Sequence, residues 1–179
     1  MSYHSRDGEN ANSAVIVTVT PKDYGTEDAL AGVEFQRKLE ENAYRLGNGK
    51  IPVQTFGDFK KNKASAGPGK IKPQMRGEYQ WTNVRNIFPE DLAEALEEGI
   101  LAFDHKIHGY AREDAVVSGV ESRTSSPVRI LRNEKFQSIV SGIYPCGEGA
   151  GYAGGITSAA MDGLKVAESV MEEYRSFDI

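Results

Sequence analysis

The amino-acid sequence predicts an α/β fold, and three features indicate it. A β-branched run over residues 14–20 has the length of a buried strand. Residues 89–109 and 155–174 place apolar side chains at helical spacing, as amphipathic helices do. A cluster of glycines lies directly before the second of these helices. We therefore expect strands and helices mixed along the chain, with the glycine cluster connecting a strand to the last helix.

The composition narrows the class of protein. The 179 residues carry 21 Lys and Arg against 26 Asp and Glu, a net charge of -5, and 39% of them are hydrophobic. No apolar run approaches the roughly 18–20 residues of a membrane span, and the first eight residues lack the apolar core of a secretory signal. The single cysteine excludes an internal disulfide and is typical of a reducing compartment. We expect a cytoplasmic protein with neither a membrane nor, given its mild acidity, a nucleic acid as partner.

A helix is expected after the first strand. Thr26 is placed to cap it, because a hydroxyl at this position accepts a backbone N–H, and the acids Glu27 and Asp28 suit the positive end of the helix dipole. The helix should reach about Leu46, where the Gly-Asn-Gly sequence of residues 47–49 would end it.

The segment from residue 51 to residue 86 shows no regular pattern. Residues 59–77 within it hold six basic side chains and no acid, namely Lys60, Lys61, Lys63, Lys70, Lys72 and Arg76. A solvated surface loop explains them, and the alternative is an anion-attracting rim over a phosphate-bearing ligand. Aromatic residues are not interleaved through the stretch, which argues against a nucleic-acid patch.

The second half of the chain is expected to contain two helices separated by short strands. Pro89 and two acids open the first of these helices, and Gly109 would end it. Its buried stripe is predicted at Leu92, Leu96, Ile100, Phe103 and Ile107. Short strands are predicted at residues 115–117, 128–131, 138–140 and 143–146. The buried stripe of the last helix is predicted at Ile156, Ala160, Leu164, Ala167, Met171 and Tyr174.

The glycine cluster is the strongest candidate for chemistry, because six of the 19 glycines fall within residues 142–155. Gly149, Gly151 and Gly154 satisfy G-x-G-x-x-G, but a dinucleotide fingerprint also needs a second strand after the helix and an acid about 20 residues further on. The loop can still bring backbone close to a ligand and end in an anion-friendly helix start. Residues 142–163 contain no basic side chain, so an anion would be held by backbone. A tight turn with close helix packing is the alternative.

Two segments carry a family resemblance: residues 119–130, GVESRTSSPVRI, and residues 144–163, YPCGEGAGYAGGITSAAMDG. The sequences SRDG at 5–8 and PVQTFGDF at 52–59 add to it. Together they resemble the C-terminal part of bacterial FAD-dependent, NAD(FAD)-utilising dehydrogenase-like proteins. The resemblance covers most of this chain and about the C-terminal third of a family member.

The resemblance implies the C-terminal portion of a split, two-domain, glutathione-reductase-like flavoprotein that lacks the N-terminal Rossmann half. Residues 1–111 would belong to the second, substrate-side domain, and residues 112–179 would return to complete the FAD-binding domain. The implied cofactor contacts are Gly147, Glu148, Gly149, Gly151, Tyr152, Ala153, Gly154, Gly155 and Ile156. Glu148 would lie near the ribityl or pyrophosphate group, and residues 151–156 near the flavin ring. Candidate substrate or flavin contacts are Arg123, Thr124, Ser125, Ser126 and Arg129.

The implied parent activity is that of a flavin-dependent oxidoreductase, with FAD as cofactor and NAD(P)H as a candidate partner. This chain alone is expected to be inactive and to bind FAD weakly or not at all, because the pyrophosphate loop would be absent. One alternative is a non-enzymatic anion- or nucleotide-binding or interaction module that uses residues 147–155. Exposed truncated faces could also pair as a homodimer.

The remaining reactive side chains form no recognisable motif. Cys146 is interpreted as a buried, inert thiol, since no second cysteine lies near it in a C-x-x-C motif. His105 and His108 lack the further ligands of a metal site, so no metal is expected.

Overall fold

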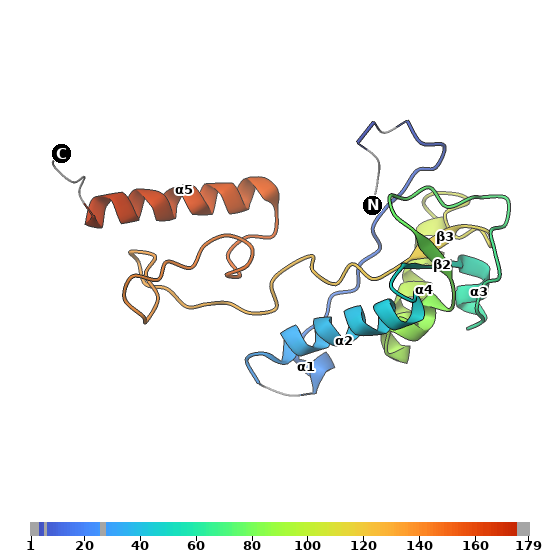
Figure 1. The fold of residues 1–179 in the computed structure, drawn as a ribbon, viewed down its shortest axis with the longest axis horizontal. Helices are drawn as coiled ribbons and strands as arrows, with labels where there is room; N and C mark the ends of the chain where they lie inside the picture. The colour runs from blue at the N-terminus through green and yellow to red at the C-terminus, as the bar shows by residue number, and fades with distance from the viewer. Residues whose placement is uncertain (1–3, 6, 26–27, 175–179) are drawn as a thin grey trace. The chain divides into compact units, whose positions relative to one another are not determined.

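The computed structural model describes residues 4–5, 7–25 and 28–174, and it is a small mixed α/β structure (Figure 1). The chain divides into two compact units. The first comprises the residues up to 23 together with 37–122, and the second comprises 24–36 together with the residues from 123 onward. In the part of the chain that the structure describes, no helix is both long and apolar enough to cross a bilayer.

A three-stranded sheet organises the first unit. The central strand β1 (Ile51–Thr55) pairs in parallel with β2 (Tyr79–Trp81) and antiparallel with β3 (Val116–Ser118). Val53 lies opposite Trp81 on one side and Ser118 on the other. Strand β1 is buried from its second residue onward because it has neighbours on both edges.

Short helices cover this sheet and complete the core of the first unit. They are α3 (Phe56–Lys60), the 3-10 helix η1 (Val84–Ile87) and α4 (Glu90–Asp104). Thr55 caps α3, since its Oγ1 accepts the N–H of Asp58 at 3.3 Å. The buried apolar side chains are Leu39, Ala43, Val53, Phe56, Phe59, Val84, Ile87, Leu92, Ala93 and Ile100.

The second unit has very little apolar core. Its main element is α5 (Ile156–Glu173), and the N-terminal turns of α2 (Ala31–Leu46) also belong to it. A further short helix, α1 (Pro21–Tyr24), spans the boundary between the units. Among the described residues of the second unit, the buried apolar side chains are only Ala31, Pro145, Ala150 and Val166. Turns and loop-to-loop hydrogen bonds therefore hold most of this unit together.

Most of the predicted strands are wrong. Residues 14–20, 128–131, 138–140 and 143–146 form no strand, whereas the predicted strand at 115–117 appears as β3, shifted by one residue. The segment 14–20 has no regular secondary structure, because no described strand pairs with it to form a hydrogen-bond ladder, and Ile16 is 68% exposed. Conversely, β1, α3, β2 and most of η1 fall within residues 51–86, where the sequence shows no regular pattern.

The predicted helices are confirmed in part. Helix α2 ends at Leu46 as expected but begins only at Ala31, so the predicted first turn at Asp28 is wrong, while Thr26 and Glu27 lie outside the described residues. Helix α4 ends five residues before Gly109, with Leu92 and Ile100 buried as expected and Ile107 exposed in the following turn. Helix α5 matches its predicted range within one residue.

The predicted buried stripe of α5 is exposed instead. Its members are Ile156, Ala160, Leu164, Ala167, Met171 and Tyr174. Ile156 is 94% exposed, Leu164 65% and Met171 72%. Helical spacing predicts which residues share a face, but burial needs a partner on that face, and Val166 on another face is the buried residue.

Candidate glycine-loop site

The glycine loop, residues 147–155, leads directly into the N-terminus of α5 (Figure 1). Two of its glycines are required by the backbone: Gly147 has a φ of 67° and Gly151 a φ of 82°. A Cβ at Gly151 would also collide with the carbonyl oxygen of Val128 and would lie 3.0 Å from the Cα of Arg129. The loop therefore lies in close contact with the segment around residue 128.

The start of α5 presents backbone donors. The N–H of Gly155 donates to Ser158 Oγ at 3.2 Å, and the first helical hydrogen bond runs from the N–H of Ala159 to the carbonyl of Gly155 at 2.9 Å. The N–H groups of the first three helical residues, 156–158, precede that bond and have no acceptor within the helix. All three residues are exposed, so these N–H groups can face an anion or a polar ring edge.

The serine-rich segment predicted as a second part of the site does lie beside the loop. Ser126 Oγ is 3.1 Å from the carbonyl oxygen of Gly149, and the N–H of Ile130 donates to the carbonyl of Ala150 at 3.2 Å. Ser125 Oγ is 3.5 Å from the position of a Cβ built on Gly154. These contacts bring residues 125–130 and the loop into one site.

Two arginines from outside the glycine cluster reach the aromatic ring of the loop. The Arg129 guanidinium carbon is 4.3 Å from the centre of the Tyr152 ring, and that of Arg132 is 3.5 Å from it. The Tyr152 hydroxyl donates to the carbonyl of Ile130 at 3.1 Å. Two guanidinium groups therefore lie at the loop, and the exposed one belongs to Arg129, a predicted contact. That backbone alone would hold an anion stays a prediction.

Arg132 also forms a largely buried ion pair, which the spacing of residues along the sequence does not predict. It binds Asp162 with both ends of its fork, Nη1 to Oδ2 at 2.9 Å and Nη2 to Oδ1 at 2.6 Å. Their side chains are 9% and 14% exposed. The hydrogen bond from Arg132 and another from the N–H of Gly147 hold the pKa of Asp162 at about 2. Asp162 is thus a carboxylate throughout the neutral range.

Most of the other predicted site residues are exposed to solvent. Glu148, Gly149, Gly154, Gly155 and Ile156 are exposed, and Ala153 is half-buried. Arg123 and Thr124 are exposed at the start of the second unit. Cys146 is also exposed, so its interpretation as a buried thiol is wrong.

Tyr144, three residues before the loop, is tied to the end of α5. Its hydroxyl donates to Glu173 Oε2 at 3.1 Å and accepts from Gln137 Nε2 at 3.2 Å. Desolvation, followed by the hydrogen bonds to Tyr174 and Glu173, raises the pKa of Tyr144 to about 12. The phenol therefore remains protonated at neutral pH.

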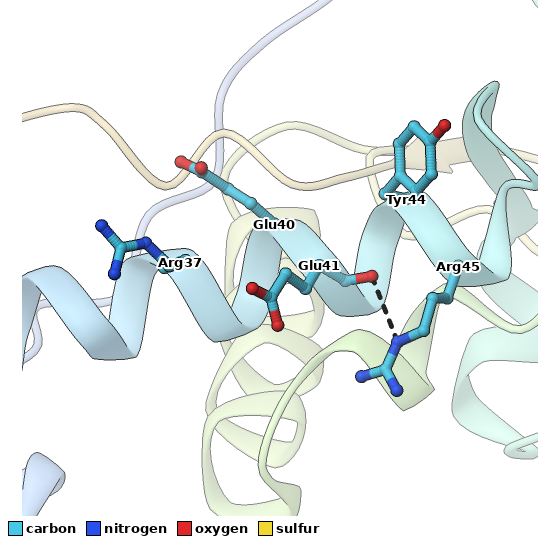
Figure 2. A pocket seen from close by; sticks show the side chains of 5 residues that line it. All are labelled: Arg37, Glu40, Glu41, Tyr44 and Arg45. Atoms are coloured by element: carbon cyan, nitrogen blue, oxygen red, sulfur yellow. Dashed lines mark hydrogen bonds between the residues drawn. The ribbon is translucent and has the colours of Figure 1, made fainter.

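A shallow hollow of mixed charge lies along α2 in the first unit. Arg37, Glu40, Glu41, Tyr44 and Arg45 line it (Figure 2). Arg45 bridges its own helix, since Nε lies 3.4 Å from the carbonyl oxygen of Glu41 and Nη2 2.6 Å from Oδ1 of Asn42. All the lining residues come from one face of one helix. A ligand site brings together polar groups from several elements, and this hollow does not.

A metal site requires histidine, cysteine or carboxylate side chains grouped around one point. In the ranges 4–5, 7–25 and 28–174, no three His, Cys, Asp or Glu side chains are grouped to hold a metal ion. Over the same ranges every buried side-chain polar atom has a hydrogen-bond partner.

Known proteins with similar sequences give the family context. A family model described as "FAD-dependent protein, C-terminal domain-like" matches residues 1–124. An uncharacterized protein of Clostridium beijerinckii is 52% identical over 177 residues, which cover 97% of this chain and 33% of that relative. This chain spans about a third of the length of the curated relative. The family match ends at residue 124, close to residue 122, where the first unit ends. The glycine loop and α5 therefore lie beyond the match.

Proposed function

Because the chain belongs to the FAD-dependent protein C-terminal domain-like family, we propose that it forms the C-terminal part of a flavin-dependent oxidoreductase of the NAD(FAD)-utilising dehydrogenase type. Residues 112–179 then complete a split, glutathione-reductase-like FAD-binding domain, and residues 1–111 belong to the substrate-side domain. The pyrophosphate-binding half comes from polypeptide outside this chain. The threefold greater length of the relative supports this proposal.

The outward face of α5 carries the proposal. At about 100° per residue, Ile156, Leu164 and Met171 lie within one narrow arc of the helix, and all three are exposed. On another face Asp162 binds Arg132, and Ser169 Oγ donates to the carbonyl of Lys135 at 3.0 Å. One face of α5 is therefore hydrogen-bonded to this chain, while its apolar face is uncovered. An exposed apolar face of this kind is typical of a helix that packs against another protein surface.

The residues of the loop fit a flavin in this arrangement. The N–H groups of residues 156–158 would face the electron-rich edge of the ring, and the positive end of the helix dipole would favour negative charge there. The exposed Ile156 side chain offers apolar contact, and the exposed Glu148 carboxylate can accept hydrogen bonds from hydroxyl groups. FAD, when bound, supplies the capacity to accept a hydride and pass it on, with NAD(P)H as the proposed donor.

FAD binding tests the proposal directly. Titration of FAD into the purified chain should give weak binding or none, because half of the site is outside it. The full-length Clostridium beijerinckii relative should retain FAD through purification. A relative without flavin, or a tight FAD complex of the chain alone, would contradict the proposal.

A nucleotide-binding module without flavin chemistry is the second candidate, favoured by the exposed Arg129 guanidinium that lies over Tyr152 of the glycine loop. ADP and inorganic phosphate are its probes. Binding of either by the chain alone, with no flavin in the full-length relative, would support this second function in place of the first.

A further inference from the structure

One guanidinium connects three parts of the second unit. Arg132 Nη1 donates to the carbonyl of Pro145 at 2.7 Å, just before the glycine loop. The same group lies over Tyr152 within the loop and pairs with Asp162 on the body of α5. Asp162 Oδ2 in turn accepts the N–H of Gly147 at 2.8 Å. The start of the loop, Tyr152 within it and the helix that follows are therefore joined through two side chains.

The surroundings of this pair have few other means of holding the loop. Ala150 is the buried apolar residue of the loop, and Val166 is the buried apolar residue of α5. Loops held by little apolar burial are open to local unfolding. Charge-assisted hydrogen bonds in a fork geometry are both stronger and more directional than apolar contacts.

We propose that Arg132 and Asp162 are a positioning pair, which sets the conformation of the glycine loop and the N-terminus of α5 before a ligand binds. This inference rests on the proposed function for the identity of the ligand, but not for the geometry. A pair of this kind is a weak source of stability, because desolvation offsets much of the attraction between buried charges. Its geometric contribution is to fix the positions of Pro145, Gly147 and Tyr152 relative to one another.

Four variants of the full chain separate positioning from stability. Asp162→Asn weakens the acceptor of the Gly147 N–H, and Arg132→Lys keeps the charge but loses the planar fork. The double variant R132M/D162L replaces the pair by apolar side chains of similar size, a change that is often neutral for stability. Arg129→Gln is the matched control, since it removes the other guanidinium over Tyr152, at 4.3 Å, without touching Asp162.

Amide hydrogen exchange of residues 147–152 is the main measurement, made without any cofactor. We expect exchange to accelerate about tenfold or more in D162N, R132K and R132M/D162L, because each loses hydrogen bonds to a charged group. Exchange should stay within about twofold of the parent chain in R129Q, since its exposed guanidinium makes only a weak contact. Exchange within β1 reports on the fold of the first unit and should not change in any variant.

Unchanged loop exchange in R132M/D162L, with α5 still protected, would overturn the positioning role and leave a merely structural pair. The single variants decide the matter if the double variant fails to fold. FAD binding is measured separately, in a chimera in which this chain replaces the aligned part of the Clostridium beijerinckii relative. Loop loosening without loss of FAD from the chimera would contradict the flavin role of the loop and not the pair itself.

Discussion

Gln54 is the clearest example of a side chain whose environment determines its role. It is the fourth residue of β1 and is fully buried. Its Nε2 donates to the carbonyl of Lys63 at 2.9 Å and to Oδ1 of Asn83 at 3.0 Å, while its Oε1 accepts the N–H of Arg85 at 3.2 Å. One amide thereby joins β1 to the loop after α3 and to η1.

Replacing Gln54 by Leu should destabilise the first unit by about 2–4 kcal/mol, because each buried group left without a partner costs roughly 1–3 kcal/mol. Urea denaturation followed by the fluorescence of Trp81, the single tryptophan of the chain and part of β2, measures this change. The control is Gln80→Leu at an exposed position of β2, which should leave the midpoint nearly unchanged. Equal effects of the two substitutions would show that the buried network adds nothing.

Arg85 illustrates the same point for a charged side chain. It is buried, and it binds Glu90 at 2.7 Å and Glu97 at 2.6 Å while its guanidinium lies over the Phe59 ring. Hydrogen bonds to the two glutamates, Glu90 first, raise its pKa despite burial. The charge is therefore retained inside the first unit, where it ties η1 to α4.

At the scale of elements, local signals predict helices and fail for strands. Helix α4 begins where Pro89 and two acids indicate, and α5 begins after Gly155, because caps and dipole preferences act within one turn. Strand β1 depends on β2 and β3, which lie more than twenty residues away along the chain. Such long-range pairing leaves no mark in a short window of sequence.

The glycine loop offers a sharp test at this scale. Gly151→Ala should loosen the loop by about 1–3 kcal/mol, since alanine is strained at positive φ and its Cβ would collide with the backbone at Val128. Gly149→Ala is the matched control, because a Cβ there meets nothing within 4 Å. Protection of the Ile130 N–H, which donates to Ala150, measures the effect. Equal protection in both variants would contradict a geometric requirement for glycine at 151.

At the scale of the whole molecule, the apolar face of α5 has the greatest consequence. The second unit buries few apolar side chains yet exposes Ile139, Ile143, Leu164 and Met171. Exposed apolar surface of this extent favours association with another protein surface. In the proposed function the partner surface is part of the missing half of the FAD-binding domain. Without that half we expect copies of this chain to associate through α5.

The double variant L164Q/M171Q should lower self-association, which light scattering over a range of concentrations measures. Lys165→Gln combined with Glu172→Gln is the matched control, because it changes two exposed polar residues of the same helix. We expect the control to associate like the parent chain. A parent chain that stays monomeric at high concentration would contradict pairing through this face.

The sequence by itself determined the positions of the long helices, the concentration of glycines before the last one and the resemblance to a flavoprotein family. Those features depend on neighbouring residues or on recognisable motifs. Only the tertiary structure decided that the stripe of α5 is uncovered, that Arg129 and Arg132 lie beside Tyr152, and that Asp162 holds the loop. These outcomes depend on which distant segments meet, and hydrophobic spacing states only that a face needs a partner, not which segment provides it.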